Sequence, residues 1–118
     1  MNKEIYKEYS NYIMEQTVNL LNIDSPSGYG KNVMEYLQKE LNGMGVSTIK
    51  TRKGGVVATI KGKHDDDAIL FEAHCDTLGG MVREIKSTGR LKITNIGGML
   101  ANNAEAENVR IITRGGRF

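Results

Sequence analysis

A histidine and an aspartate two positions apart are the residues of this sequence best suited to catalysis. His74 and Asp76 stand in "AILFEAHCDTLGGM", residues 68–81, after an apolar run and before two glycines. Residues i and i+2 of a strand face the same side, so these two side chains are expected to project together while Cys75 points away. One imidazole nitrogen can then coordinate Zn²⁺ or a similar ion, and the carboxylate can hold the N–H of the other nitrogen. His-x-Asp also occurs as a surface pair or beside a packed histidine, but the apolar run and the glycines favour a metal site.

Few other side chains near this pair could take part in the same chemistry. Glu72 and Glu84 are the nearest additional carboxylates, and Glu72 shares the face of His74 but lies deeper in the expected strand. His64, in the acidic turn "HDDD", is expected to be a surface residue. Cys75 next to a histidine raises the alternative of a metal-independent thiol hydrolase, although a small packed thiol is the simpler interpretation.

The elements before this pair are predicted to be helical. Apolar residues recur at helical spacing over residues 3–22, and a turn containing the only proline follows. Ser27 is then expected to be the N-cap of a second helix with an apolar stripe over residues 33–44. Gly43 or Gly45 can end that helix.

The rest of the chain has the short, alternating patterns that are typical of β-strands. The segment 68–73 is the most apolar of them and is expected to be a buried strand. Two helices followed by strands predict an α/β fold, whereas the alternating strands after Gly80 predict an antiparallel, barrel-like unit. We therefore expect a domain over residues 1–78 and an incomplete β-barrel over residues 79–118. The expected strands are 46–51, 55–62, 68–73, 80–85, 91–96 and 108–114.

Composition and charge exclude several classes of protein. The 118 residues are 39% apolar and 25% charged, with a net charge of +2 and no basic block, so nucleic-acid and membrane partners are not expected. One cysteine cannot form an internal disulfide, and the charged N-terminus is not that of a signal peptide. No apolar run approaches the ~20 residues of a membrane span. A cytoplasmic location is the expectation.

The last segment predicts that the chain is truncated. "NVRIITRGGRF", residues 108–118, has a strand, a Gly-Gly turn and only two residues of a return strand. The backbone groups of such a strand lack the partners of a completed hairpin.

Four separated segments together resemble the family 42 metallopeptidases. These are dinuclear-metal aminopeptidases that include glutamyl aminopeptidase, the tetrahedral aminopeptidases and proteins once named cellulase-M. The resemblance runs in register from about Met14 to Arg117 and covers the N-terminal portion of a family member. The segments are "DSPSGYGKNVMEYLQKEL", "RKGGVVATIKG", "AILFEAHCDTLGGMV" and "LKITNIGG".

The resemblance implies a fold, a reaction and a role for each residue of the pair. The fold would be a peptidase α/β domain into which a β-barrel dimerisation domain is inserted after residue 78. His74 would be a ligand of one of two Zn²⁺ or Co²⁺ ions, and Asp76 the catalytic-site carboxylate that orients His74 and tunes the metal. Water activated by the two metals would attack the peptide bond, so that residues are removed from the N-terminus of peptides. Homo-oligomers, often dodecamers, are implied as well.

The resemblance implies that the remaining metal ligands and the general base would lie beyond residue 118. Since catalytic zinc usually takes about three protein ligands, the 118-residue chain is expected to be inactive and to hold no metal stably. An alternative is a non-catalytic α/β module that self-associates through the unpaired strand edges after Gly80.

Overall fold

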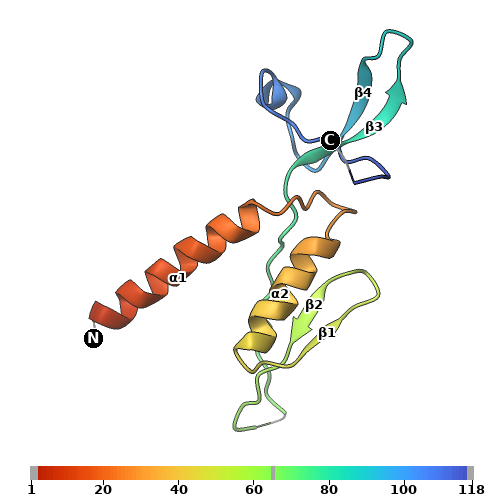
Figure 1. Cartoon of the computed structure of the whole chain (residues 1–118). Coiled ribbons are helices and arrows are strands. Elements are labelled where there is room, and N and C mark those ends of the chain that lie inside the picture. The colour runs from red at the N-terminus through yellow and green to blue at the C-terminus, as the bar shows by residue number, and fades with distance from the viewer. Residues whose placement is uncertain (1–2, 65, 117–118) are drawn as a thin grey trace. The chain divides into compact units, whose positions relative to one another are not determined.

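The structure, a computed structural model, describes residues 3–64 and 66–116. Its contacts divide the chain into two units, Met1–Leu78 and Gly79–Phe118. Helices and small antiparallel sheets are consistent with the α/β class, whereas the barrel and the assignment of these units to two domains stay predictions. The elements are α1 (Lys3–Leu21), α2 (Lys31–Gly43), β1 (Thr48–Lys50), β2 (Val56–Ala58), β3 (Gly79–Ile85), β4 (Leu91–Ile96) and a 3-10 helix, η1 (Ala101–Ala104) (Figure 1).

The two predicted helices are present, and polar side chains join them. The Tyr36 hydroxyl of α2 donates to Oε1 of Gln16 in α1 at 2.6 Å, and Nδ2 of Asn19 donates to the same hydroxyl at 3.0 Å. Nε2 of Gln16 also donates to Oε2 of Glu40 at 3.5 Å. Tyr36 is therefore the residue of α2 through which most of these hydrogen bonds pass.

The N-terminal end of α2 differs from the sequence prediction, whereas its C-terminal end agrees with it. The N-cap is Gly30, with no side-chain hydrogen bond to the helix, so the assignment of Ser27 as N-cap is wrong. At the other end Gly45 has φ +80°. The N–H groups of Gly45 and Val46 donate to the carbonyls of Asn42 (2.9 Å) and Leu41 (3.0 Å), which is a Schellman motif. Gly45 can end the helix in this way because glycine adopts a positive φ without steric cost.

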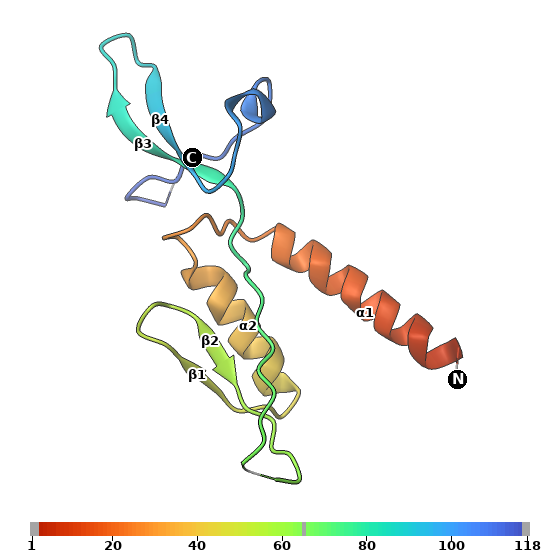
Figure 2. The same ribbon diagram turned by 180° about the vertical axis from the view of Figure 1, so that it is seen from behind.

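A short β-hairpin packs on α2 in the first unit. Strands β1 and β2 pair antiparallel with Thr48 opposite Ala58 and Lys50 opposite Val56, and both contact α2 (Figures 1 and 2). Val33 of α2 is the buried apolar side chain among the described residues. The hydrophobic core of this unit is accordingly small.

The prediction of a buried strand over residues 68–73 is wrong for the chain as the structure describes it. No strand is assigned there, and Ile69, Leu70 and Phe71 are 80%, 82% and 90% exposed. A β-strand depends on neighbouring strands for its backbone hydrogen bonds. Within the described residues no strand pairs with this segment, so its apolar sequence does not lead to burial.

The second unit contains one antiparallel hairpin, β3–β4. Gly79 pairs with Ile96 and Ile85 with Leu91, and the register shifts between Val82 and Glu84 as in a β-bulge. The residues expected to form a further strand, 108–114, have no strand assignment, so that prediction is wrong.

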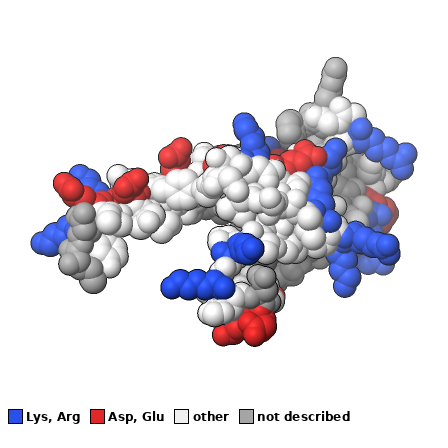
Figure 3. Space-filling view, turned by 90° about the horizontal axis from the view of Figure 1, so that it is seen from below, with Lys and Arg blue, Asp and Glu red and all other residues white. Residues whose placement is uncertain are grey.

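Large apolar side chains are exposed over both units. Tyr9, Ile13 and Val18 of α1 are exposed in the first unit, and Ile85 of β3 in the second. The face drawn in Figure 3 carries acidic and basic side chains with broad uncharged areas between them. Within the described residues, no helix is both long and apolar enough to cross a membrane.

Candidate functional site

The turn between the two helices is built so that Ser27 occupies one of its two central positions. The N–H of Tyr29 donates to the carbonyl of Pro26 at 2.8 Å, which closes a four-residue β-turn. Gly28 has φ +90°, the value that the third residue of a type II turn requires and that glycine reaches most easily. Ser27 is the second residue of this turn, so the conformation of the turn determines the direction in which the Ser27 side chain projects.

The same turn is bonded to the segment that carries His74 and Asp76. The N–H of Thr77 donates to the carbonyl of Ser25 at 3.0 Å, and Pro26 and Thr77 form an isolated parallel bridge. Oγ of Ser25, which is fully buried, donates to the carbonyl of Cys75 at 2.9 Å. These contacts fix the segment against the turn although it belongs to no sheet.

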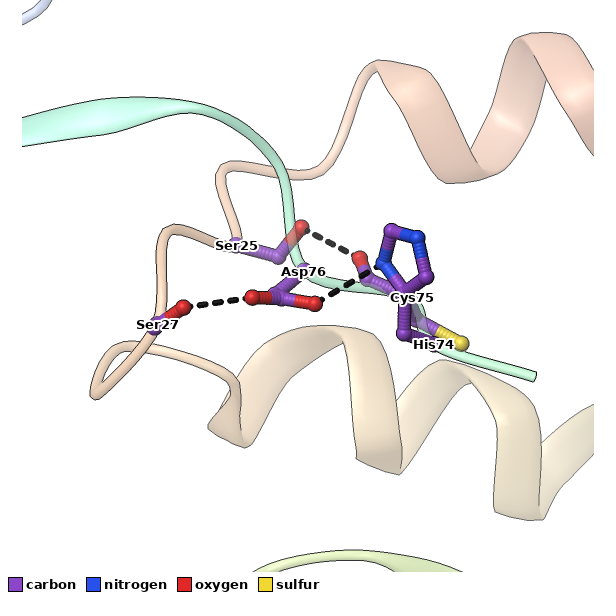
Figure 4. A network of polar contacts seen from close by, with 5 residues as sticks. All are labelled: Ser25, Ser27, His74, Cys75 and Asp76. Atoms are coloured by element: carbon purple, nitrogen blue, oxygen red, sulfur yellow. Dashed lines mark hydrogen bonds and ion pairs between the residues drawn. The ribbon is translucent and has the colours of Figure 1, made fainter. Parts of the chain in front are cut away.

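Three side chains then form a chain of polar contacts, Ser27–Asp76–His74 (Figure 4). Nδ1 of His74 lies 2.9 Å from Oδ1 of Asp76, and the Ser27 hydroxyl donates to Oδ2 of the same carboxylate. The contact between His74 and Asp76 is the one expected for residues i and i+2 on one face of an extended segment.

The protonation states in this cluster follow from its hydrogen bonds. The hydrogen bond from Ser27, followed by that from His74, lowers the pKa of Asp76 below its ordinary value. An ionised carboxylate can only accept, so the Asp76 contact requires the proton of a neutral His74 imidazole to sit on Nδ1. Nε2 is then the nitrogen that presents a lone pair, as a metal ligand must.

Both members of the pair are open to solvent. The side chains of His74 and Asp76 are 86% and 47% exposed. Asp76 and Ser27 also line a hollow of about 500 Å³, together with the first turn of α2 and the hairpin turn at residues 53–55. Two of the lysines that line it, Lys31 and Lys50, lie 3.9 Å and 3.6 Å from the same carboxylate oxygen of Glu35, whose single negative charge offsets part of theirs.

Cys75 is poorly suited to act as a nucleophile. Its side chain is half-buried. Burial, and to a lesser extent the charge of Asp76, raises the pKa of the thiol. A raised pKa keeps the group as a thiol near neutral pH, whereas the nucleophile is the thiolate. These properties do not favour the thiol-hydrolase alternative.

The other carboxylates and the second histidine do not join the pair. His64 is exposed, as predicted, and Glu72 is exposed as well. Glu84 belongs to the second unit, where its Oε2 lies 4.0 Å from Nζ of Lys92. Over residues 3–64 and 66–116, no three His, Cys, Asp or Glu side chains are grouped so that they could hold a metal ion. The described residues therefore supply one imidazole and its supporting carboxylate.

Ser25 and Ser27 contact the segment that carries His74 and Asp76, and the sequence does not predict these contacts. The partners lie 49 or 50 positions apart in the sequence, and no local pattern specifies such a contact.

Comparisons with known proteins assign the chain to a family. Residues 54–118, which contain both His74 and Asp76, match the family model described as M42 glutamyl aminopeptidase. The chain belongs to the M42 glutamyl aminopeptidase family.

A curated relative supports the same assignment. The chain is 41% identical over 105 residues to "Putative aminopeptidase YhfE" of Bacillus subtilis (strain 168), a match that covers 89% of the chain. The match covers 30% of that relative, so the chain spans about a third of its length.

Proposed function

We propose that this chain is a portion of a metal-dependent aminopeptidase that removes N-terminal residues from peptides. The observation that carries the proposal is the contact between Nδ1 of His74 and Oδ1 of Asp76 at 2.9 Å, in a family whose described activity is that of an aminopeptidase. The contact leaves Nε2 of an exposed imidazole to bind a cation, and the Asp76 carboxylate makes that nitrogen a stronger metal ligand.

The residues of the chain fit one part of a zinc or cobalt centre. Imidazole nitrogen is a common ligand of both ions, and a carboxylate on the second nitrogen is its usual support. A metal bound there would polarise a substrate carbonyl and acidify a water molecule. His74 would hold the ion, Asp76 would orient His74, and Ser27 would restrain Asp76.

One ligand falls short of the three that catalytic zinc usually takes from protein. Ligands encoded elsewhere would have to complete a centre of two metal ions, and the 118-residue chain is proposed to be inactive by itself. Assembly into a homo-oligomer and a cytoplasmic location stay predictions.

A chimera tests the proposal directly. In it, the 105 residues of this chain that match YhfE replace their counterparts there. Release of leucine or glutamate from anilide substrates is measured after chelation and again after Zn²⁺ or Co²⁺ is restored. We expect metal-dependent turnover that His74→Ala abolishes and His64→Ala, a change of the other histidine, leaves intact. Turnover that survives His74→Ala, or that chelation does not reduce, would refute the proposal.

A second candidate function, a self-associating module without catalysis, is favoured by one observation. Ile69, Leu70 and Phe71 are at least 80% exposed in an extended segment with no strand beside it among the described residues. Such a segment can recruit a strand from another copy. Light scattering that shows a mass rising with concentration, together with an inactive chimera, would support this candidate instead.

A further inference from the structure

The Asp76 carboxylate is restrained from two sides by residues of different segments. Oδ1 contacts Nδ1 of His74, which is two residues away, and Oδ2 accepts a hydrogen bond from Ser27, which is 49 residues away. The contact with His74 by itself leaves the carboxylate able to rotate about its terminal bond, because that torsion has a broad energy profile. A second hydrogen bond on the other oxygen removes this freedom.

The backbone contacts explain why Ser27 can reach across the fold. Ser25 binds the segment twice, through its carbonyl to the N–H of Thr77 at 3.0 Å and through its hydroxyl to the carbonyl of Cys75 at 2.9 Å. Ser25 is fully buried, so water does not compete for these bonds. The type II turn then places Ser27 beside Asp76.

We propose that Ser27 is a positioning residue for the candidate metal ligand His74. Its hydroxyl holds Asp76 in the orientation in which the carboxylate accepts from Nδ1, and this selects the tautomer whose Nε2 presents a lone pair. The role of the tautomer rests on the proposed function, in which His74 binds the metal ion through a bare Nε2. The positioning itself is a property of this chain and needs no metal.

The imidazole ¹⁵N resonances of the 118-residue chain test this inference. They distinguish a protonated from a bare ring nitrogen and are recorded at a pH of about 8, where a neutral imidazole predominates. The chain contains two histidines, so exposed His64 serves as an internal reference. In the unaltered chain we expect Nδ1 of His74 to be protonated and Nε2 bare, unlike the tautomer mixture at His64.

Three substitutions distinguish the loss of the Ser27 hydroxyl from a general loss of structure. Ser27→Ala is expected to shift both nitrogens of His74 toward the values of His64, whereas Ser27→Thr keeps the hydroxyl and the original values. Ser47→Ala, which removes an exposed serine hydroxyl elsewhere in the same unit, should change neither histidine. Continued protection of the Thr77 amide in Ser27→Ala would show that the backbone contact with Ser25 persists, so the shift would report the lost hydroxyl.

The results separate this inference from the proposed function. His74 resonances that stay unchanged in Ser27→Ala but move in Asp76→Ala would overturn it, because Asp76 would then be oriented without Ser27. So would an unaltered chain in which His74 and His64 have the same tautomer mixture. If the YhfE chimera is inactive while Ser27→Ala still shifts His74, the proposed function fails and the positioning role stands. If the chimera is active and Ser27→Ala does not shift the His74 resonances, the proposed function stands and the positioning role fails.

Discussion

Replacing Gly28 with alanine tests how the candidate site depends on one backbone conformation. Gly28 has φ +90°, and within the described chain no atom beyond Gly28 and its two neighbours in sequence lies within 4 Å of the position that a Cβ would take. The substitution therefore adds backbone strain without a steric clash. An alanine in the left-handed region costs about 1–2 kcal/mol.

This cost converts into a measurable change at the turn. About 1–2 kcal/mol corresponds to roughly a 5- to 30-fold shift toward the open turn. Opening breaks the hydrogen bond from the N–H of Tyr29 to the carbonyl of Pro26. We expect amide exchange of Tyr29 in Gly28→Ala to accelerate by a factor in that range, and exchange at Thr77 to accelerate with it where the turn and the bound segment open together.

Gly43→Ala provides the matched control in the same unit. Beyond its sequence neighbours and the nearby backbone of α2, Gly43 also has no atom of the described chain within 4 Å of a Cβ position, but its φ is helical, so alanine is tolerated there. Unchanged exchange of Tyr29 in Gly28→Ala, or an equal acceleration in Gly43→Ala, would contradict a strained alanine at position 28.

Three further predictions concern the helix end, the thiol and the carboxyl group. Gly45→Ala, at φ +80°, should lower the free energy of unfolding measured by thermal denaturation. Gly43→Ala, within α2, should raise this free energy by up to about 1 kcal/mol. Alkylation of Cys75 by iodoacetamide at neutral pH should be slow because burial raises the pKa of its thiol, and Asp76→Asn should accelerate it by removing a neighbouring negative charge. The pKa of the Asp76 carboxyl group is held below 3.8, chiefly by the hydrogen bond from Ser27. The stability that this lowered pKa contributes is therefore present above pH 3.8 and is lost as the pH falls through the pKa of the folded state. The carboxyl ¹³C resonance of Asp76 follows this titration, and Ser27→Ala should move the midpoint of the titration upward.

Local patterns were sufficient to predict those elements that local contacts stabilise. The periodicity of residues 3–22 predicted α1, and Gly45 was one of two glycines expected to end α2. The alternating segments 80–85 and 91–96 became β3 and β4, which a short turn joins. In each case the residues that form the hydrogen bonds lie close together in the sequence, so propensity and turn chemistry determine the result.

The failed predictions concern long-range contacts. The apolar composition of residues 68–73 indicates what the segment would gain from burial, but burial also requires neighbouring strands, which the described residues do not provide. Ser27 was assigned to the nearest helix because N-caps are local, whereas its partner is Asp76. The spacing of His74 and Asp76 predicted their contact, since only two residues separate them.

The proposed function requires that His74 offers Nε2 to a metal ion while Asp76 holds Nδ1. A crystal structure of the YhfE chimera grown with Zn²⁺, with anomalous diffraction data collected at the zinc edge, tests it most directly. We predict an anomalous peak about 2.0–2.1 Å from Nε2 of His74, with Nδ1 still bonded to Asp76. A zinc ion bound through Nδ1, or zinc sites that all lie away from His74, would contradict this requirement.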